Sequence, residues 1–388
     1  MKSNLPFPEK LDITVTCASG VEKVTKTELE RLGYPSAPAV NGSITFSGDK
    51  SAVARCNINL RTADRVYIKI AQFPAQTFDE LYDGVYQIPW QNYLPKDAKI
   101  IVNGKSVKSK LFALSACQSI IKKAIIKGLS RYYGISLFPE TGSLYQVEFW
   151  VFKDEVTLLL NTSGTGLHKR GYRDLVGIAP IKETLASALL LMSDFYYNRP
   201  FIDPFCGSGT IVIEGAKIAL NIAPNILRDF DFRHWTNFDK KYYTQAYEQA
   251  KDNEKLDRQI DFSGYDIDQK AIKLARHHAV LAGLNKMVRF ERREVKDLTS
   301  ESAFGTIVTN PPYGERVYDI KQAEQCYKEL GEALKKMQGW SLFAITSAKS
   351  FERYLGKRAD RERKLYNSNK ECRYYYYYGQ KEKPNDRR

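Results

Sequence analysis

Metal-binding side chains are scarce in this 388-residue sequence, which has four histidines and six cysteines. The cysteines lie far apart, with no C-x-x-C pair and no histidine at metal-ligand spacing. This pattern argues against structural zinc and against a disulfide-stapled scaffold. We therefore expect free thiols, no bound metal and a reducing, cytoplasmic location.

Long apolar runs are missing as well. No stretch reaches 18 consecutive apolar residues, and the opening MKSNLPFPEK is not followed by the apolar segment that marks a secretion signal. The sequence thus predicts neither membrane insertion nor secretion. Hydrophobic residues make up 43% and charged residues 27%, a balance typical of globular proteins. The length predicts two or three domains.

Positive charge is in excess, because 59 Lys and Arg face 45 Asp and Glu, which leaves a net charge of +14. Residues 96–131 hold nine basic residues and one acid, and residues 353–388 hold twelve against five. Both clusters interleave aromatic residues, so we expect a polyanionic partner, with nucleic acid as the first candidate. The alternative is a solvated surface that happens to be basic.

The two halves of the chain differ in pattern. Up to about residue 165, short strands and helices alternate in an α+β arrangement, including a basic amphipathic helix over 115–134 and two strands around Lys153-Asp154. Beyond it, strands and helices alternate regularly from FIDPF at 201–205 to WSLFAITS at 340–347. This second pattern predicts a doubly wound, mostly parallel sheet that binds ligands at the carboxyl ends of its strands. The apolar run 374–378 predicts a closing strand near the sheet edge.

The first motif is DPFCGSGT at 203–210, between a predicted strand and helix. Gly207 and Gly209 allow a ligand to approach the backbone, and the following helix offers free N–H groups. The motif lacks the third glycine of the dinucleotide fingerprint, since Ile213 stands there, and the next strand-end acid lies far beyond the roughly 20 residues expected of an NAD site. Hydride transfer is therefore disfavoured. A ligand-free βα turn is the alternative.

The second motif is GYDID at 264–268, at the end of the next strand. A carboxylate there can accept both ribose hydroxyls of a nucleoside cofactor. We expect Asp266 in that role and Asp268 as the cap of the following helix.

The third motif is NPPYG at 310–314, after the apolar strand TIVT. The two prolines stiffen the loop, so the Asn310 side chain and the Pro311 carbonyl are expected to be fixed acceptors. Tyr313 would add a flat ring for stacking. Two acceptors and a ring can grip an exocyclic amine of a nucleobase. An ordinary proline-rich loop with a core tyrosine is the alternative.

The order DPFCGSGT, GYDID, NPPYGER resembles the class I S-adenosylmethionine methyltransferases that modify amino groups of nucleobases. The upstream α+β region, with LHKRGYR and the KETLA helix, resembles THUMP-containing RNA methyltransferases. The segment IAPNILRDFDFRHW at 222–235 is similar to the insert of large-subunit rRNA guanine-N2 methyltransferases of the RlmL type. The resemblance covers nearly the whole chain, without the second methyltransferase module of the longer enzymes.

This resemblance implies a Rossmann-like methyltransferase domain at 166–388, preceded by a ferredoxin-like part at 1–60 and a THUMP RNA-binding domain at 61–165. It implies S-adenosyl-L-methionine as cofactor and RNA, 23S rRNA or a pre-ribosomal particle, as partner, with no membrane and no metal. The implied cofactor contacts are Thr184, Asp203, Phe205, Gly207, Gly209, Asp266, Ile267, Glu294, Val295 and Asn310. The implied catalytic residues, which form the target pocket, are Asn310, Pro311 and Tyr313.

The basic residues expected at RNA are Lys105, Lys108, Lys110, Lys122, Lys123, Lys127, Arg131, Lys169 and Arg170. We predict methylation of guanine N2 in large-subunit rRNA. Two alternatives stay open: N6-adenine methylation of RNA or DNA, and a non-catalytic RNA-binding or ribosome assembly factor. The motif itself does not separate guanine from adenine, since both offer an exocyclic amine.

Overall fold

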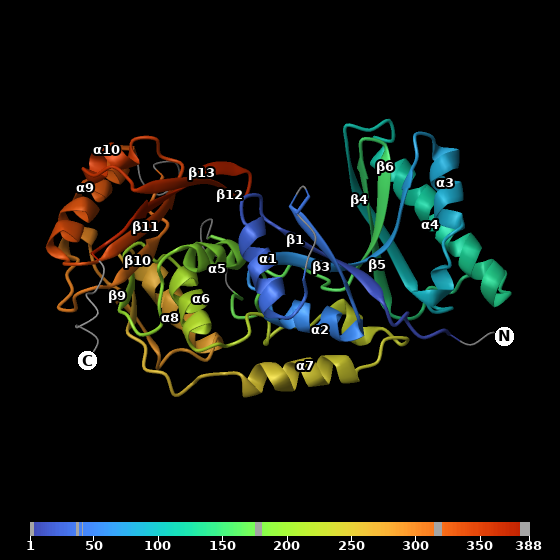
Figure 1. Cartoon of the computed structure of the whole chain (residues 1–388), viewed down its shortest axis with the longest axis horizontal. Helices are drawn as coiled ribbons and strands as arrows, with labels where there is room; N and C mark the ends of the chain where they lie inside the picture. The colour runs from blue at the N-terminus through green and yellow to red at the C-terminus, as the bar shows by residue number, and fades with distance from the viewer. Residues whose placement is uncertain (1–3, 36–38, 41, 175–180, 314–319, 381–388) are drawn as a thin grey trace. The chain divides into compact units, whose positions relative to one another are not determined.

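The computed structural model describes residues 4–35, 39–40, 42–174, 181–313 and 320–380 (Figure 1). The chain divides into two compact units. Unit 1 comprises Met1–Thr16, Lys26–Leu167 and Arg228–Gln249, and unit 2 comprises Cys17–Thr25, His168–Leu227 and Ala250–Arg388.

A six-stranded sheet with the order β2-β1-β3-β6-β5-β4 forms the centre of unit 1. Its strands are β1 (Leu11–Cys17), β2 (Ser43–Gly48), β3 (Ala63–Pro74), β4 (Lys99–Val107), β5 (Leu144–Phe152) and β6 (Glu155–Asn161). Strands β5 and β6 form an antiparallel hairpin whose turn is Lys153-Asp154, as predicted. Both turn residues have positive φ, +53° and +63°, which matches the twist of a tight hairpin.

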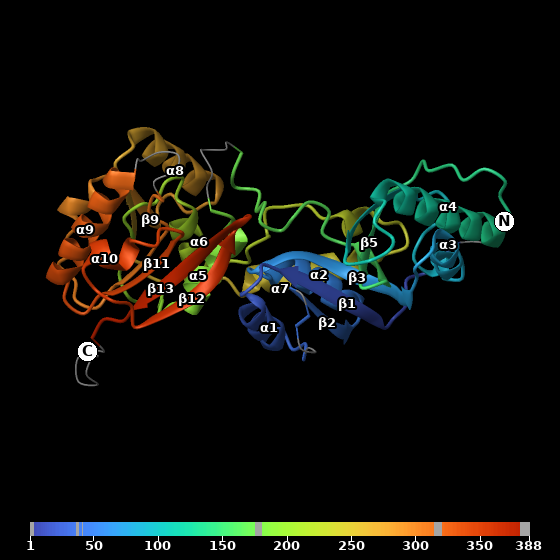
Figure 2. The ribbon, with the colours of Figure 1, turned by 90° about the horizontal axis from the view of Figure 1, so that it is seen from above.

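The helices in this part of the chain are α1 (Glu22–Arg31), α2 (Lys50–Asn59), α3 (Phe78–Tyr86), η1 (Trp90–Asn92) and α4 (Leu114–Tyr133). Helix α4 confirms the predicted basic amphipathic helix. It buries Ile121, Ile125 and Leu129, and it ends at Gly134, whose φ is +69°. Figure 1 and Figure 2 both show α3 lying beside α4.

The segment 228–249, with η2 (Asp231–His234) and most of α7 (Lys241–Asp252), belongs to unit 1 although it lies within the range 166–388 that the sequence assigns to the methyltransferase domain. The Trp235 ring stacks on Tyr145 of β5 at 4.9 Å between centroids, and its indole N–H donates to the Leu144 carbonyl at 2.9 Å. Gln146 donates to Asp231 at 2.6 Å. Segment 228–249, from the second half of the chain, thus packs on the sheet formed by the first half.

Unit 2 is built on a seven-stranded sheet with the order β12-β13-β11-β10-β7-β8-β9. Its strands are β7 (Phe201–Asp203), β8 (Phe262–Asp266), β9 (Val288–Arg292), β10 (Thr306–Thr309), β11 (Ser341–Thr346), β12 (Arg361–Asn367) and β13 (Lys370–Tyr377). The five neighbouring strands β11, β10, β7, β8 and β9 are parallel. Strand β13 pairs antiparallel with β11 and β12. This is the expected doubly wound α/β fold. The predicted closing strand is β13, and β12, which was not predicted, forms the edge.

Helices cover both faces of this sheet. They are α5 (Glu183–Met192), α6 (Thr210–Ala219), α8 (Gln269–Leu281), η3 (Val295–Asp297), α9 (Ile320–Lys336) and α10 (Phe351–Leu355). Val308 and Phe343 pack with α5, α6 and α8, while Ile307 and Leu342, one position away, pack with α9 and α10. Burial on both faces explains why the centres of β10 and β11, Ile307-Val308 and Leu342–Ile345, are uninterrupted apolar runs. Among the helices of the described residues, none combines the length and the hydropathy that a membrane span requires.

Candidate functional site

The order of strands reverses at β7, because β8 lies on one side of it and β10 on the other. Such a switch point leaves a crevice at the carboxyl ends of the strands. A cavity of about 690 Å³ lies there in unit 2. The predicted residues that line it are Asp203, Phe205, Gly207, Asp266, Ile267, Glu294, Val295 and Asn310.

The glycine turn joins β7 to α6. Gly209 is the N-cap of α6 with φ +83°, and a Cβ there would lie 2.8 Å from the Phe290 ring. Gly207, with φ +51°, donates its N–H to Asp266 Oδ2 at 2.9 Å. Gly209 is not among the lining residues; it gives the turn its shape, while Gly207 lies on the cavity wall.

Asp266, at the end of β8, organises the neighbouring loop. Its Oδ1 accepts from the Asp268 N–H at 2.9 Å, and its other oxygen accepts from Gly207. Asp268 caps α8 by accepting from the Lys270 N–H at 2.8 Å, which confirms the predicted cap. Burial raises the pKa of Asp266 above its ordinary value.

Asp203 connects the glycine turn to the loop after β10. Its Oδ1 accepts from the Thr309 hydroxyl at 2.6 Å and from the Phe205 N–H at 3.1 Å. The residue is 1% exposed, and burial raises its pKa to about 7, with a smaller contribution from the charge of Asp266. Because Thr309 directly precedes Asn310, this bond holds the two predicted halves of the site together.

The opposite wall carries apolar and charged side chains. Ile267 is 42% exposed and lines the cavity, as do Glu294 and Val295. Glu294 forms an ion pair with Lys296 at 2.7 Å. Sequence reasoning missed Arg293, whose guanidinium lies 4.1 Å from the Tyr265 ring centroid and whose side chain also lines the cavity. The sequence position could have indicated Arg293, since it directly precedes Glu294 and Val295, which were predicted as cofactor contacts.

The loop after β10 contributes Asn310 and Pro312 to the cavity. The Pro312 carbonyl accepts from the Tyr327 hydroxyl of α9 at 2.5 Å, which anchors the loop. Pro311 is buried and is not one of the lining residues. Gly314 and the two residues after it in the predicted motif lie outside the described residues.

Tyr313 has a different place from the one predicted. Its ring packs against the core on the α5, α6 and α8 side of the sheet rather than lining the cavity, and its hydroxyl donates to Asn310 Oδ1. Burial raises its pKa above the ordinary range of tyrosine. In this arrangement the ring, on which a base was expected to stack, does not border the cavity.

Thr184, predicted as a cofactor contact, lies away from the cavity wall. It lies in the first turn of α5, is 4% exposed and does not line the cavity. Ile181, just before the helix, lines the cavity instead. Within this segment, the residue on the cavity wall thus lies three positions before Thr184.

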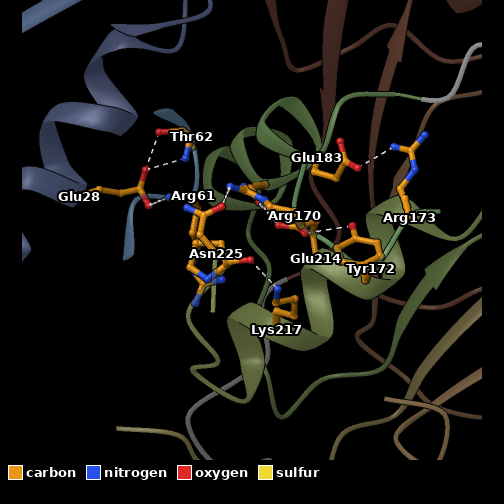
Figure 3. Close-up of polar contacts among 12 residues, drawn as sticks. Glu28, Arg61, Thr62, Arg170, Tyr172, Arg173, Glu183, Glu214, Lys217 and Asn225 are labelled. Carbon is orange, nitrogen blue, oxygen red and sulfur yellow. Dashed lines mark hydrogen bonds and ion pairs between the residues drawn. The ribbon is translucent and has the colours of Figure 1, made fainter. Parts of the chain in front are cut away.

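Arg170 was expected at RNA, but its side chain is buried at 1% exposure. Its guanidinium lies 3.6 Å from the Glu214 carboxylate and donates to Asn225 Oδ1 at 2.8 Å (Figure 3). Tyr172 and Ser187 also donate to Glu214, at 3.0 and 2.6 Å. Arg170 therefore ties α6 to the neighbouring loop, and a contact with RNA is excluded in this arrangement.

The remaining residues expected at RNA are at the surface. Lys105, Lys108, Lys110, Lys123, Lys127 and Arg131 of unit 1 and Lys169 of unit 2 are exposed. Lys122 is half-buried and forms an ion pair with Glu140 at 2.8 Å. In the part of the chain that the structure describes, no cluster of His, Cys, Asp or Glu could hold a metal ion.

Comparison with known families assigns the chain. The description "RMKL-like, methyltransferase domain" matches residues 170–376, "RlmL ferredoxin-like domain" matches 12–67 and "THUMP domain" matches 75–161. This chain belongs to the RMKL-like methyltransferase family. The family match confirms the resemblance drawn from the motifs and the predicted fold.

Two curated relatives are similar over most of this chain. A Bacillus subtilis (strain 168) protein named "Putative RNA methyltransferase YpsC" is 42% identical over 95% of this chain and 96% of its own length. The "Ribosomal RNA large subunit methyltransferase K/L" of Allochromatium vinosum is 36% identical over 89% of this chain. The matched region spans only 49% of that relative, so this chain covers about half of the K/L protein.

Two solved structures have the same fold. SMU.472, complexed with SAH, is 39% identical with a TM-score of 0.93, and the match covers 97% of this chain and all of that one. A Listeria monocytogenes protein described as a "predicted N6-adenine-specific DNA methylase" is 44% identical with a TM-score of 0.92, covering 96% of this chain and 97% of that one. The chain is thus an S-adenosylmethionine-dependent methyltransferase.

Proposed function

We propose that this enzyme methylates an exocyclic amine of a nucleobase in RNA, and that the amine is N2 of a guanine in 23S rRNA. One observation carries the proposal. The Asp203–Thr309 hydrogen bond joins the glycine turn to the loop that carries Asn310, so both border one cavity. A cofactor on the turn and an amine at Asn310 would therefore be neighbours.

The cavity suits the proposed cofactor by charge and shape. Two buried carboxylates, Asp203 and Asp266, favour a ligand that carries a sulfonium and an ammonium group. The turn at Gly207 brings bare backbone to the wall, and Asp266 has lone pairs left for ribose hydroxyls. Ile267 offers an apolar face for the adenine, with Glu294 and Val295 beside it.

The chain's own residues align the reactants rather than form covalent bonds. S-adenosylmethionine supplies an electrophilic methyl group, so no nucleophilic side chain is required. Asn310 Oδ1, on the cavity wall, would accept an N–H group of the target amine, which turns the amine's lone pair away from the ring and toward the methyl. The Pro311 carbonyl, the second predicted acceptor, belongs to a buried residue that does not line the cavity. Cys206 is buried in the cofactor turn and its pKa is raised by burial, which disfavours a thiolate mechanism of the kind that methylates a cytosine ring carbon.

Helix α4 of unit 1 supports RNA as the substrate. Its 20 residues include no Asp or Glu, and the exposed residues Ser115, Ser119, Lys123, Lys127 and Arg131 recur at every fourth position. That spacing places successive side chains about 6 Å apart along the helix, close to the separation of neighbouring phosphates on one strand. A row of this kind, with three cations and two hydroxyl groups, suits binding to the RNA backbone rather than to its sequence.

The names of the relatives leave the base open. The Allochromatium relative is named for large-subunit ribosomal RNA, and the Listeria structure is named for N6-adenine in DNA. The ferredoxin-like and THUMP regions favour RNA. The resemblance of residues 222–235 to the insert of guanine-N2 methyltransferases favours guanine N2. N6-adenine methylation is the second candidate, since the Asn310 oxygen on the cavity wall would accept from either amine.

The test is methyl transfer to deproteinised ribosomal RNA, followed by nucleoside analysis. We expect N2-methylguanosine in the 23S fraction. N6-methyladenosine as the only product would show that the target amine is N6 of adenine and not N2 of guanine. Binding of cofactor and RNA without any methylated product would favour the non-catalytic alternative.

A further inference from the structure

The hydroxyl of Tyr313 lies in a small polar cluster between the target loop and the β12–β13 hairpin. It donates to Asn310 Oδ1. Asn367, the last residue of β12, donates its Nδ2–H to the same hydroxyl at 3.5 Å, and the Cys372 thiol of β13 lies 3.8 Å from it. The Lys370 ammonium lies 5.1 Å from the Tyr313 ring centroid.

The donors around this hydroxyl determine where its proton points. A phenol has one proton and two lone pairs. Because the Asn367 amide and the Cys372 thiol both donate to the oxygen, the phenolic proton is directed to Asn310. Asn310 Oδ1 then keeps one lone pair for another donor, and Asn310 lines the cavity.

An asparagine amide has an acceptor end and a donor end of nearly equal shape. If the Asn310 amide rotated by half a turn, its N–H groups would face the N–H groups of the target amine. The hydrogen bond from Tyr313 stabilises the orientation in which Asn310 Oδ1, and not the amide nitrogen, is available to accept from the target amine. This also explains why the tyrosine of the motif is buried against the core.

We propose that Tyr313 and Asn367 are positioning residues that hold the acceptor end of Asn310 toward the target amine. The inference rests on the proposed function, because it requires an amine as the methyl acceptor. It assigns the β12–β13 hairpin, which lies outside the three sequence motifs, a role in the reaction.

The experiment compares Tyr313→Phe, Asn367→Ala and Asn367→Asp in the full-length enzyme. An ionised aspartate has nearly the shape of asparagine but only accepts hydrogen bonds, so it would draw the phenolic proton away from Asn310. We expect kcat to fall about 3- to 10-fold in Tyr313→Phe, the effect of one hydrogen bond. The kcat of Asn367→Asp should fall further than the kcat of Asn367→Ala. The KM for S-adenosylmethionine and the Kd for SAH should stay within about twofold.

Asn369→Asp is the matched control, because Asn369 is exposed in the turn of the same hairpin. It adds the same charge two residues away and should leave kcat unchanged. A merely structural role of Asn367 predicts the reverse order, with Asn367→Ala at least as impaired as Asn367→Asp and with weaker SAH binding.

Product analysis of the wild-type enzyme in the same assay separates the two proposals. A methylated exocyclic amine together with wild-type kcat in Tyr313→Phe and Asn367→Asp overturns the positioning role alone. A methylated ring carbon or ribose in the wild-type product overturns the proposed function and this inference with it.

Discussion

The two units of this enzyme use their polar residues in opposite ways. In unit 2, the groups around the cavity are buried and bonded in fixed directions, as Asp203 is to Thr309 and Phe205. In unit 1, the basic residues proposed to bind RNA are exposed and recur along α4. Buried directional contacts are individually essential, whereas exposed charges contribute small and additive amounts. Single substitutions should therefore have large effects in unit 2 and small ones in unit 1.

The largest effect is expected for Asn310→Ala. Removal of the acceptor for the target amine should lower kcat by about 10³-fold, comparable to the loss of a preorganised group that acts in the transition state. The Kd for SAH, measured by calorimetry, should change less than about threefold. Equal losses of turnover and of SAH binding would show that Asn310 is a cofactor ligand instead.

The adjacent residues Lys169 and Arg170 contrast an exposed and a buried cation in unit 2. Arg170→Ala should lower the free energy of unfolding by about 3–5 kcal/mol, because it leaves the Glu214 charge buried without its ion pair. Lys169→Ala should have little effect on stability and should weaken RNA binding. Urea denaturation and RNA titration of both variants measure this difference, and similar stabilities would contradict the burial of Arg170.

The two glycines of the turn provide a second matched pair. Gly209→Ala combines a positive φ with a Cβ 2.8 Å from Phe290, and should destabilise unit 2 by roughly 2–4 kcal/mol. At Gly207, also at positive φ, a Cβ meets nothing within 4 Å, so Ala should cost about 1 kcal/mol. Denaturant midpoints rank the two, and a reversed ranking would refute the described turn.

The buried acid Asp203 predicts a pH dependence of stability. Its pKa is raised from near 3.8 to about 7, so between these values the folded state binds a proton that the unfolded state has lost. The free energy of unfolding should therefore fall as pH rises, by roughly 2 kcal/mol from pH 5.5 to 7. Asp203→Asn should remove this component. The same slope in both proteins would assign the pH dependence to other groups.

The smallest effects are expected on α4. Lys123→Ala, Lys127→Ala and Arg131→Ala should each weaken RNA binding a few-fold and lower the slope of log K against log salt by about 1. Lys122→Ala is the control, since Lys122 is engaged with Glu140 and should leave the slope unchanged. If Lys122 mattered as much as Lys127, non-specific charge rather than the row on α4 would explain binding.

Local sequence patterns predicted the main elements because they repeat at short range. The side chains of β5 are alternately buried and less buried, the pattern that predicts a strand. The three motifs predicted the strand ends that surround the cavity. The pattern did not reveal β12, whose charged residues suit an exposed sheet edge rather than a buried strand. The packing of segment 228–249 within unit 1 was also beyond the sequence pattern, because its partners Leu144 and Tyr145 are distant in sequence.

Burial was the other information that the sequence lacked. Arg170 lies in a basic run, which predicts a surface residue. Its side chain is instead buried with Glu214 of α6, which is distant in sequence. Tyr313 belongs to a motif that suggests stacking, yet its hydroxyl is held by residues of a hairpin more than 50 positions later. Such long-range polar pairings determine the roles of individual side chains within a fold that short-range patterns already predict.

The most direct test of the account is a crystal structure of the enzyme with SAH. We expect the ribose hydroxyls to bond to Asp266 and the sulfur to lie above the glycine turn, facing Asn310 across the cavity. SAH bound elsewhere, or in this cavity with its sulfur turned away from Asn310, would contradict the account.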